Sequence, residues 1–105
     1  MARPMDSDTF QVEVDVELKA VIPEFIESRK NECALIDRLL EEGKFKEIEG
    51  LGHRLKGTGG SYGFDAISDI GEALEQAAAL HDRDSIAREC RMLHRYLERV
   101  TVIYV

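Results

Sequence analysis

The chain has 105 residues, a length that fits one domain with a single modest core and excludes an enzyme with two domains around a deep cleft. Its formal net charge of −7 disfavours binding to nucleic acid or to an anionic membrane surface, because both require a basic face. No window approaches the roughly 18 consecutive apolar residues of a membrane span, and residues 1–10 lack the apolar segment of a secretory signal. We therefore expect a cytoplasmic protein.

The first part of the chain carries two competing patterns. Apolar and polar side chains alternate over residues 10–18, which is typical of a strand. Because no other segment alternates in this way, a strand here would lack a partner. Residues 14–22 also place apolar side chains at helical spacing. We therefore predict a flexible segment over residues 1–14 and a folded domain over residues 15–105, which opens with a short helix from about Asp15.

Two longer helices are expected next. The first covers residues 22–42, where Pro23 is tolerated in the first turn and Gly43 ends the helix. The second covers residues 44–62 and is ended by Gly63. Both carry an apolar stripe at helical spacing, so each must bury one face against another element.

A third and a fourth helix complete the chain. Asp65 is expected to cap the third, and Asp84 or Ser85 to cap the fourth after a polar turn. Short connections place neighbouring helices antiparallel, so we predict an all-α, up-and-down four-helix bundle with a short extra helix or an extended segment at its N-terminus. The four expected stripes are Ile22, Phe25, Ile26, Cys33, Ile36 and Leu40; Ile48, Leu51, Leu55 and Tyr62; Ile67, Ile70, Leu74 and Ala78; and Ile86, Cys90, Leu93, Leu97 and Val100.

The cysteines and two of the histidines are expected to be structural. Cys33 and Cys90 form no C-x-x-C pair, so two buried thiols are favoured over a disulfide or metal ligands. His81 lies in the polar turn and His94 at the edge of the last stripe. The histidines and cysteines lack ligand spacing, so no metal site is predicted. Arg29 falls within an apolar stripe, and the sequence offers no reason for it.

The segment Ile48–Phe64 contains the candidate functional residue. At about 100° per residue, its apolar side chains gather in one sector, and His53 lies roughly 160° from that sector. The imidazole should therefore face water rather than the core. Its neighbours one or two turns away are Lys46, Gly50, Lys56, Gly57 and Gly60.

Those neighbours leave the helix surface around the imidazole bare and flanked by two ammonium groups. A glycine inside a helix costs about 1 kcal/mol relative to alanine, so Gly57, Gly59 and Gly60 require a compensating role. Gly59 faces the core, where close helix packing would explain it. Gly57 and Gly60 lie on the histidine side, where packing offers no reason. This surface suits a bulky anion that another macromolecule delivers.

Phosphoryl transfer fits such a surface. Imidazole ordinarily titrates at about pH 6.5, so at cytoplasmic pH it has a free ring nitrogen that can attack phosphorus without a general base. For phosphoryl transfer, the protein mainly has to position the reacting groups and neutralise the charge on the phosphoryl oxygens. Lys56, one turn after His53, is placed to neutralise the phosphoryl oxygens.

The motif around His53 resembles the H-x-x-K-G-[ST] signature of histidine-containing phosphotransfer (HPt) domains. It spans His53–Thr58, and Gly63 follows ten residues after the histidine. Residues 59–62 depart from the family pattern of small or polar residues followed by an aliphatic one. The resemblance covers about residues 22–97 and implies a four-helix bundle. Beyond the motif, the family's next apolar positions and its Leu-Glu pair are matched by Ile67, Ile70, Leu74 and Glu75.

The resemblance implies a role for each matching residue. His53 would be phosphorylated, Lys56 would be its charge partner, Gly57 would leave room for the donor, and Gly63 would form the turn after the active helix. In some members a glutamine on the next helix supports the imidazole, and Glu75 stands at that position here. Members shuttle phosphoryl groups between aspartates of response-regulator receiver domains, and the receiver supplies the Mg²⁺.

We therefore predict a monomeric phosphorelay carrier rather than an enzyme with its own turnover. It would accept a phosphoryl group on His53 from a receiver phospho-aspartate, pass it to another receiver, and work with a hybrid histidine kinase while binding no cofactor itself. The alternative is a helical adaptor that binds a receiver or kinase domain without carrying phosphate. A third reading is a fragment of a larger kinase, although Met1 and a full bundle favour a free-standing protein. Residues expected to assist docking or to support the site are Lys46, Gly50, Arg54, Gly60, Gly63 and Glu75.

Overall fold

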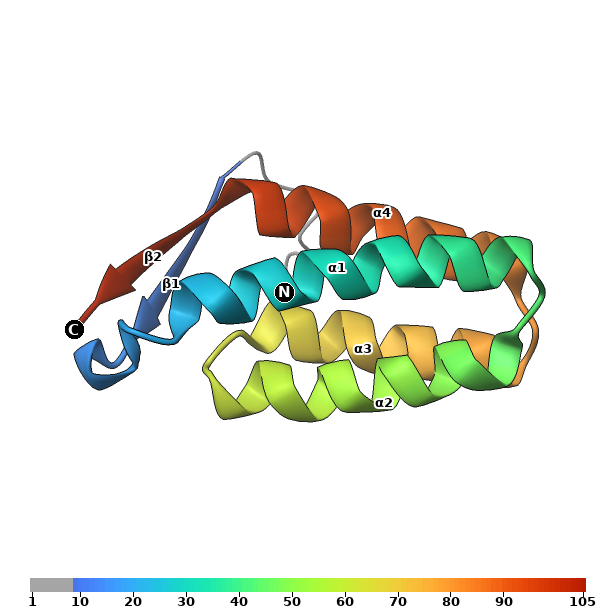
Figure 1. The fold of residues 1–105 in the computed structure, drawn as a ribbon, viewed down its shortest axis with the longest axis horizontal. Coiled ribbons are helices and arrows are strands. Elements are labelled where there is room, and N and C mark those ends of the chain that lie inside the picture. Colours follow the sequence, from blue (N-terminus) through green and yellow to red (C-terminus); the bar gives the residue numbers. More distant parts are fainter. Residues whose placement is uncertain (1–8) are drawn as a thin grey trace.

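The computed structural model describes residues 9–105. Figure 1 shows the helices side by side, with consecutive helices joined by short turns at alternating ends of the bundle. They are α1 (Ile22–Glu41), α2 (Phe45–Ser61), α3 (Asp65–Ala79) and α4 (Arg83–Arg99). The four predicted helices are therefore confirmed. Within the described part of the chain, no helix is long and apolar enough to cross a membrane.

The ends of α1 and α2 follow the residues that mark them in the sequence. Pro23 lies in the first turn of α1. Gly43 and Gly63 have φ angles of 70° and 86°, a left-handed conformation that glycine adopts without a steric penalty. These two glycines end α1 and α2 as predicted.

The starts of α3 and α4 correct the predicted caps. Phe64 precedes α3 and no side chain caps that helix, so Asp65 is its first residue rather than its cap. Asp82 caps α4, because its Oδ1 accepts a hydrogen bond from the backbone N–H of Ser85 at 3.1 Å. The cap therefore lies two residues before Asp84. Hydrogen bonds from the hydroxyl and the backbone amide of Ser85 lower the pKa of the Asp82 carboxyl.

Residues 10–14 form a strand, so the fold includes a small two-stranded sheet that the all-α prediction, with its extra N-terminal helix or extended segment, did not contain. β1 (Phe10–Val14) pairs in parallel with β2 (Val100–Tyr104), and Val12 lies opposite Val102. The partner that the sequence reading missed is a run of β-branched and aromatic residues at the other end of the chain. Residues 1–8 of the segment predicted to be flexible lie outside the described residues.

A short connection joins this strand to the bundle. Asp15 caps the 3₁₀ helix η2 (Val16–Leu18) by accepting a hydrogen bond from the backbone N–H of Glu17. Val14 is buried in the same core as the helices, so the packed unit begins before the expected boundary at residue 15. Val100, expected in the last helical stripe, instead begins β2.

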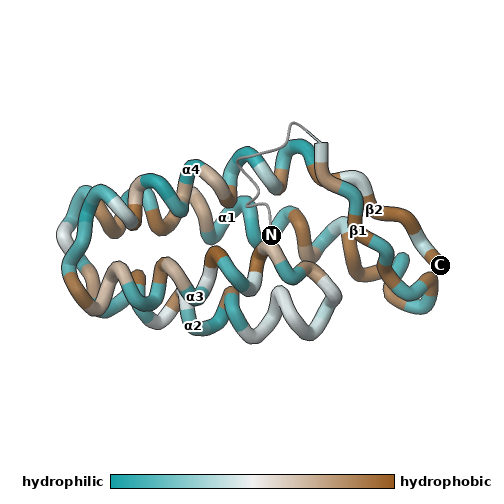
Figure 2. The backbone as a smooth tube through the Cα atoms, turned by 180° about the vertical axis from the view of Figure 1, so that it is seen from behind, coloured by the Kyte–Doolittle hydropathy of each residue, from teal (hydrophilic) through white to brown (hydrophobic). Residues whose placement is uncertain are grey.

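The core lies between the four helices. Figure 2 shows hydrophobic positions recurring along the helices and along β2. Both cysteines are free and buried, as predicted. Most of the predicted stripe residues are buried as well, but Ile26, Leu40 and Tyr62 are only partly buried, and the core also takes in Leu39, Phe64, Met92 and Tyr96.

The structure gives Arg29 a packing role between α1 and α2. Its guanidinium lies over the ring of Phe25, 4.8 Å from the centroid, and forms an ion pair with Glu32 on the same helix. It also donates a hydrogen bond to Thr58 Oγ1 on α2 at 3.3 Å. The aliphatic stem of an arginine can cover apolar surface while its head keeps polar partners, which explains its place in the stripe.

Candidate functional site

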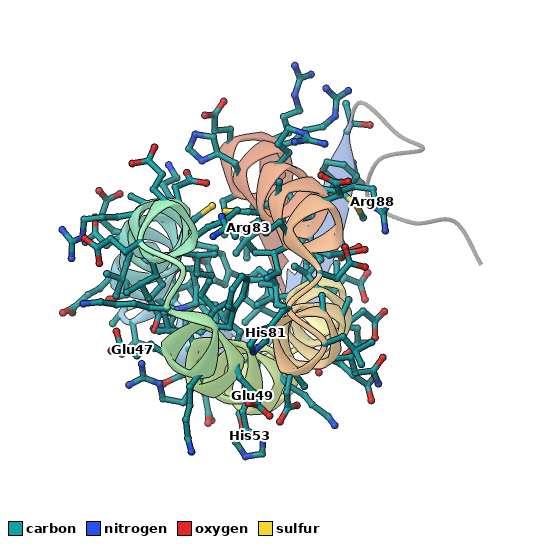
Figure 3. All side chains as sticks on the ribbon, turned by 90° about the vertical axis from the view of Figure 1, so that its right-hand side faces the viewer. Glu47, Glu49, His53, His81, Arg83 and Arg88 are labelled. Carbon is teal, nitrogen blue, oxygen red and sulfur yellow. The ribbon has the colours of Figure 1, made fainter. Side chains whose placement is uncertain are left out.

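His53 projects from α2 into solvent, and its side chain is 72% exposed. Figure 3 shows His53 and Glu49 on the side of α2 that faces away from the bundle. The orientation predicted from helical periodicity is therefore confirmed. Glu49, one turn before His53, adds a carboxylate that the list of neighbouring lysines and glycines left out.

The imidazole of His53 is held by a carboxylate from α3. Its Nδ1 lies 3.0 Å from Oε2 of Glu75, whose side chain is only 27% exposed. An ionised carboxylate can only accept hydrogen bonds, so Nδ1 carries the proton in this pair. The other ring nitrogen, Nε2, then has a free lone pair. The contact sets the tautomer and the direction of the imidazole.

Two glycines allow α3 to approach α2 closely enough for this contact. A Cβ atom added to Gly52 would lie 2.7 Å from the backbone nitrogen of Glu75, and one added to Gly71 would lie 2.5 Å from that of Lys56. Neither position can hold a side chain without moving a backbone. Because Gly52 directly precedes His53, the close approach seats the Glu75 backbone beside the histidine.

Two further residues secure the same helix pair. A Cβ atom on Gly59 would lie 2.7 Å from the backbone nitrogen of Ser68, so the predicted packing role of Gly59 is confirmed. The hydroxyl of Ser68 donates a hydrogen bond to the carbonyl of Lys56 at 2.8 Å. The α2–α3 pair is therefore fixed along its length, which keeps the Glu75 carboxylate in register with His53.

Lys56 lies one turn after His53 and has an acidic partner. Its Nζ is 3.4 Å from Oε1 of Glu72, and both side chains are about half exposed. Glu49, Glu72 and Glu75 thus surround the site with carboxylates, so the surface is more balanced in charge than the flanking lysines indicated. An exposed ion pair of this kind contributes about 0–1 kcal/mol to stability. A more highly charged anion could therefore displace Glu72 from Lys56.

The remaining predicted site residues differ in their surroundings. Gly57 has open space where a side chain would stand, and Gly60 has only Ser68 Oγ, at 3.9 Å. The surface beside the imidazole is therefore bare, as predicted. Gly50 and Arg54 line a groove between α1 and α2. Lys46 is exposed near the start of α2, about 10 Å along the helix from His53.

The other histidines have separate surroundings. His81 lies in the turn between α3 and α4 with a φ of 54°, and its ring stacks on Phe45 at a centroid distance of 4.3 Å. His94 lies on α4, where its Nε2 is 3.6 Å from Glu98. Within residues 9–105, no group of three or more histidine, cysteine, aspartate or glutamate side chains is placed to hold a metal ion.

Besides Glu49, sequence reasoning missed Gly52, Gly71 and Glu72. Gly52 and Gly59 are seven residues apart and so share one face of α2, which in retrospect marks a surface for close packing. The partner face could not be assigned without the register of α3. Glu72 could have been noted one turn before Glu75, but its pairing with Lys56 also depends on that register.

Comparison with protein-family models agrees with this geometry. The model of the Hpt domain matches residues 20–101. That match covers most of the chain, so the chain belongs to the Hpt domain family. Neither the comparison with curated proteins nor the comparison with solved structures yields a match. The family is one of phosphorelay histidine phosphotransfer, in which members interact with receiver domains and kinases.

Proposed function

We propose that this protein is a phosphorelay carrier in which His53 accepts a phosphoryl group from the phospho-aspartate of one receiver domain and passes it to another. The observation that supports this most directly is the contact of His53 Nδ1 with Glu75. It leaves Nε2 as the nucleophile on a side chain that is 72% exposed. A receiver can therefore bring its phospho-aspartate to Nε2 from solvent.

The transfer forms one bond and breaks another. The Nε2 lone pair attacks phosphorus, the N–P bond forms, and the bond from phosphorus to the aspartate oxygen breaks, so that the aspartate leaves as a carboxylate. The imidazole gains positive charge while Nδ1 keeps its proton. The Glu75 carboxylate then faces an imidazolium-like ring, which lowers the energy of the charged product. The reverse reaction delivers the group to a second receiver.

Lys56 and Gly57 assist from the next turn of α2. In this proposal the Lys56 ammonium turns from Glu72 toward the phosphoryl oxygens, because a dianionic group attracts it more strongly than one exposed carboxylate does. The open space at Gly57 lets the receiver surface approach the ring. The neighbouring surface of α2, including Gly50, Arg54 and Gly60, makes the contact with the receiver.

The chain acts as a carrier and not as an enzyme with turnover of its own. The receiver holds the Mg²⁺ that neutralises charge on its side of the transition state, and a hybrid histidine kinase feeds phosphoryl groups into the relay. Because the receiver and the kinase supply the rest, the carrier needs only an oriented, accessible imidazole, that of His53, and one cation, that of Lys56. Both are present on α2.

A labelling experiment tests the proposal. A panel of purified receiver domains is phosphorylated with labelled acetyl phosphate, cleared of donor and mixed with the protein. Acid-labile, base-stable label is expected on the wild type and absent from His53→Gln. The matched control is His94→Gln, because His94 is also exposed, at 62%, and also lies near a glutamate. Equal labelling of His53→Gln and wild type would refute the proposal.

A second donor separates the carrier from the adaptor hypothesis. Phosphoramidate is a small phosphoryl donor that needs no docking surface, so it reports the reactivity of Nε2 alone. A carrier reacts with phosphoramidate and with at least one phospho-receiver. A protein that binds receivers yet takes label from neither donor would be an adaptor.

A further inference from the structure

Two cysteines that are far apart in the sequence meet in the core between α1 and α4. The Sγ atoms of Cys33 and Cys90 are 3.3 Å apart. Each Sγ also lies 3.4 Å from the backbone carbonyl oxygen of the other cysteine. The side chains are 1% and 2% exposed. Figure 3 shows α1 and α4 on the side of the bundle away from the outward-pointing His53, so the proposed phosphotransfer leaves this pair unused.

The surroundings give the two sulfurs different chemistry. The hydrogen bond with Cys90 lowers the pKa of Cys33, whereas that same bond together with burial raises the pKa of Cys90. The Oδ1 atom of Asp37 lies 3.3 Å from Cys90 Sγ, and a carboxylate this close disfavours a negative charge on that sulfur. Cys33 is therefore the sulfur that more readily becomes a thiolate, the form that reacts with oxidants. Asp37 is exposed, so the pair lies directly beneath the surface.

We propose that Cys33 and Cys90 form a redox-active dithiol that closes reversibly into a disulfide linking α1 to α4. The sulfurs need to approach by little more than 1 Å to reach the bonding distance of about 2.05 Å. Reversible disulfides that sense or transmit redox changes are the usual kind in reducing compartments. The proposal concerns the sulfurs alone and stands apart from the role of His53.

Hydrogen peroxide is a small oxidant that can enter when the α1–α4 contact opens locally. The Cys33 thiolate attacks one oxygen, an S–O bond forms, the O–O bond breaks and water leaves after protonation. The Cys90 sulfur then attacks Cys33 sulfur, the S–S bond forms, the S–O bond breaks and a second water leaves. Two thiols and one peroxide thus yield one disulfide and two waters. Because the sulfurs are buried, local opening of the α1–α4 contact limits the rate.

The disulfide would constrain the unfolded chain strongly, since the two cysteines are 57 positions apart. We expect the melting temperature to rise by about 10 °C or more on oxidation. Reduction should restore the original value. Oxidation would thus stabilise the folded protein while His53 stays exposed. It would thereby prolong the time for which the protein remains folded and able to carry phosphoryl groups.

The test uses the full chain, hydrogen peroxide, and alkylation of the remaining thiols under denaturing conditions. The proposal expects a monomer whose intact mass falls by two hydrogens, with neither cysteine alkylated, and full recovery of two alkylatable thiols after dithiothreitol. Cys33→Ser and Cys90→Ser should each keep one alkylatable thiol or form only intermolecular products. Circular dichroism checks that these variants fold, and Cys33→Ala replaces Cys33→Ser if the buried hydroxyl prevents folding.

Three outcomes would overturn the proposal. The first is survival of both thiols in wild type after prolonged peroxide treatment that oxidises a free thiol standard. The second is a mass gain from oxygen addition with no disulfide. The third is a disulfide found only between two copies of the chain.

Discussion

The Nδ1 atom of His53 on α2 lies 3.0 Å from Oε2 of Glu75 on α3, which leaves Nε2 of the exposed imidazole free. The contact depends on Gly52, where the Glu75 backbone comes closer than any side chain would permit. The same feature that packs the two helices therefore also orients the reactive ring. This coupling between helix packing and imidazole orientation underlies the first two predictions.

Removing the Glu75 carboxylate should slow phosphorylation of His53 without unfolding the bundle. Glu75→Ala frees the ring to rotate and lets the proton move to Nε2, so we expect a loss of about 10- to 100-fold in the rate with phosphoramidate. Glu75→Gln keeps a side-chain oxygen that accepts a hydrogen bond from Nδ1, so its rate with phosphoramidate should fall less. Long-range ¹⁵N spectra of the imidazole check the cause, since the Nδ1–H tautomer should dominate in wild type and weaken in Glu75→Ala. Equal rates in all three proteins would contradict the role of Glu75.

Two alanine substitutions should separate the glycines that clear the approach from those that pack the helices. Gly57→Ala meets no neighbouring atom and should raise the free energy of unfolding by about 0.5–1 kcal/mol, through helix propensity. Gly71→Ala would place a Cβ 2.5 Å from the backbone nitrogen of Lys56. It should therefore lower the free energy of unfolding by about 1–3 kcal/mol. Urea unfolding followed by circular dichroism measures both.

Gly57→Ala should also impair transfer from a receiver while it leaves the reaction with phosphoramidate unchanged. A misplacement of about 1 Å at the reacting atoms can cost about 100-fold in rate, and a methyl group at this position pushes the receiver away. The reaction with phosphoramidate is the internal control, because that donor needs no docking surface. If Gly57→Ala accepts phosphoryl groups from receivers at the wild-type rate, Gly57 does not serve access.

The Lys56–Glu72 pair should compete with the phosphoryl group for the ammonium. Glu72→Gln releases Lys56, and because an exposed pair contributes about 0.2–1 kcal/mol, the yield of phospho-His53 should rise up to about fivefold at low salt. Lys56→Gln should lower the rate by about tenfold, since a cation near the developing charge is lost. Both effects should shrink at high ionic strength. A fall in yield for Glu72→Gln would show instead that Glu72 positions Lys56.

Tyr96 should make the bundle sensitive to alkali. Burial, together with the charge of Asp65, raises the pKa of Tyr96 to about 12 in the folded state, whereas an unfolded tyrosine titrates at about 10. Because the folded pKa is the higher one, this contribution is complete below pH 10 and is lost as the pH rises toward 12. The loss should reach about 1.4 kcal/mol at pH 11.

Tyr96→Phe provides the control for the alkaline effect. The Tyr96 hydroxyl is buried and has no hydrogen-bond partner within residues 9–105, so removing it should leave stability at pH 7 unchanged or raise it by up to about 1 kcal/mol. Urea unfolding at pH 7, 9, 10 and 11 should show the variant losing less stability than wild type above pH 10. Parallel pH curves for the two proteins would mean that Tyr96 ionises equally in both states.

The sequence by itself determined the four helices and the outward direction of His53. Both depend on a spacing of three to four residues within one helix, which an amphipathic pattern records directly. Glycine positions also marked the ends of α1 and α2, because a left-handed backbone favours that residue locally. The closeness of Lys56 to His53 followed from the same helical repeat.

Only the tertiary structure decided which distant residues meet. The Glu75 contact joins residues 22 positions apart, and before the structure only the family resemblance pointed to it. The Cys33–Cys90 contact joins residues 57 positions apart. The pairing of β1 with β2 joins the two ends of the described chain. None of these contacts has a local pattern, because each depends on the register and distance between packed elements. The packing of α2 against α3 thus brings Glu75 to the exposed His53 and orients its imidazole.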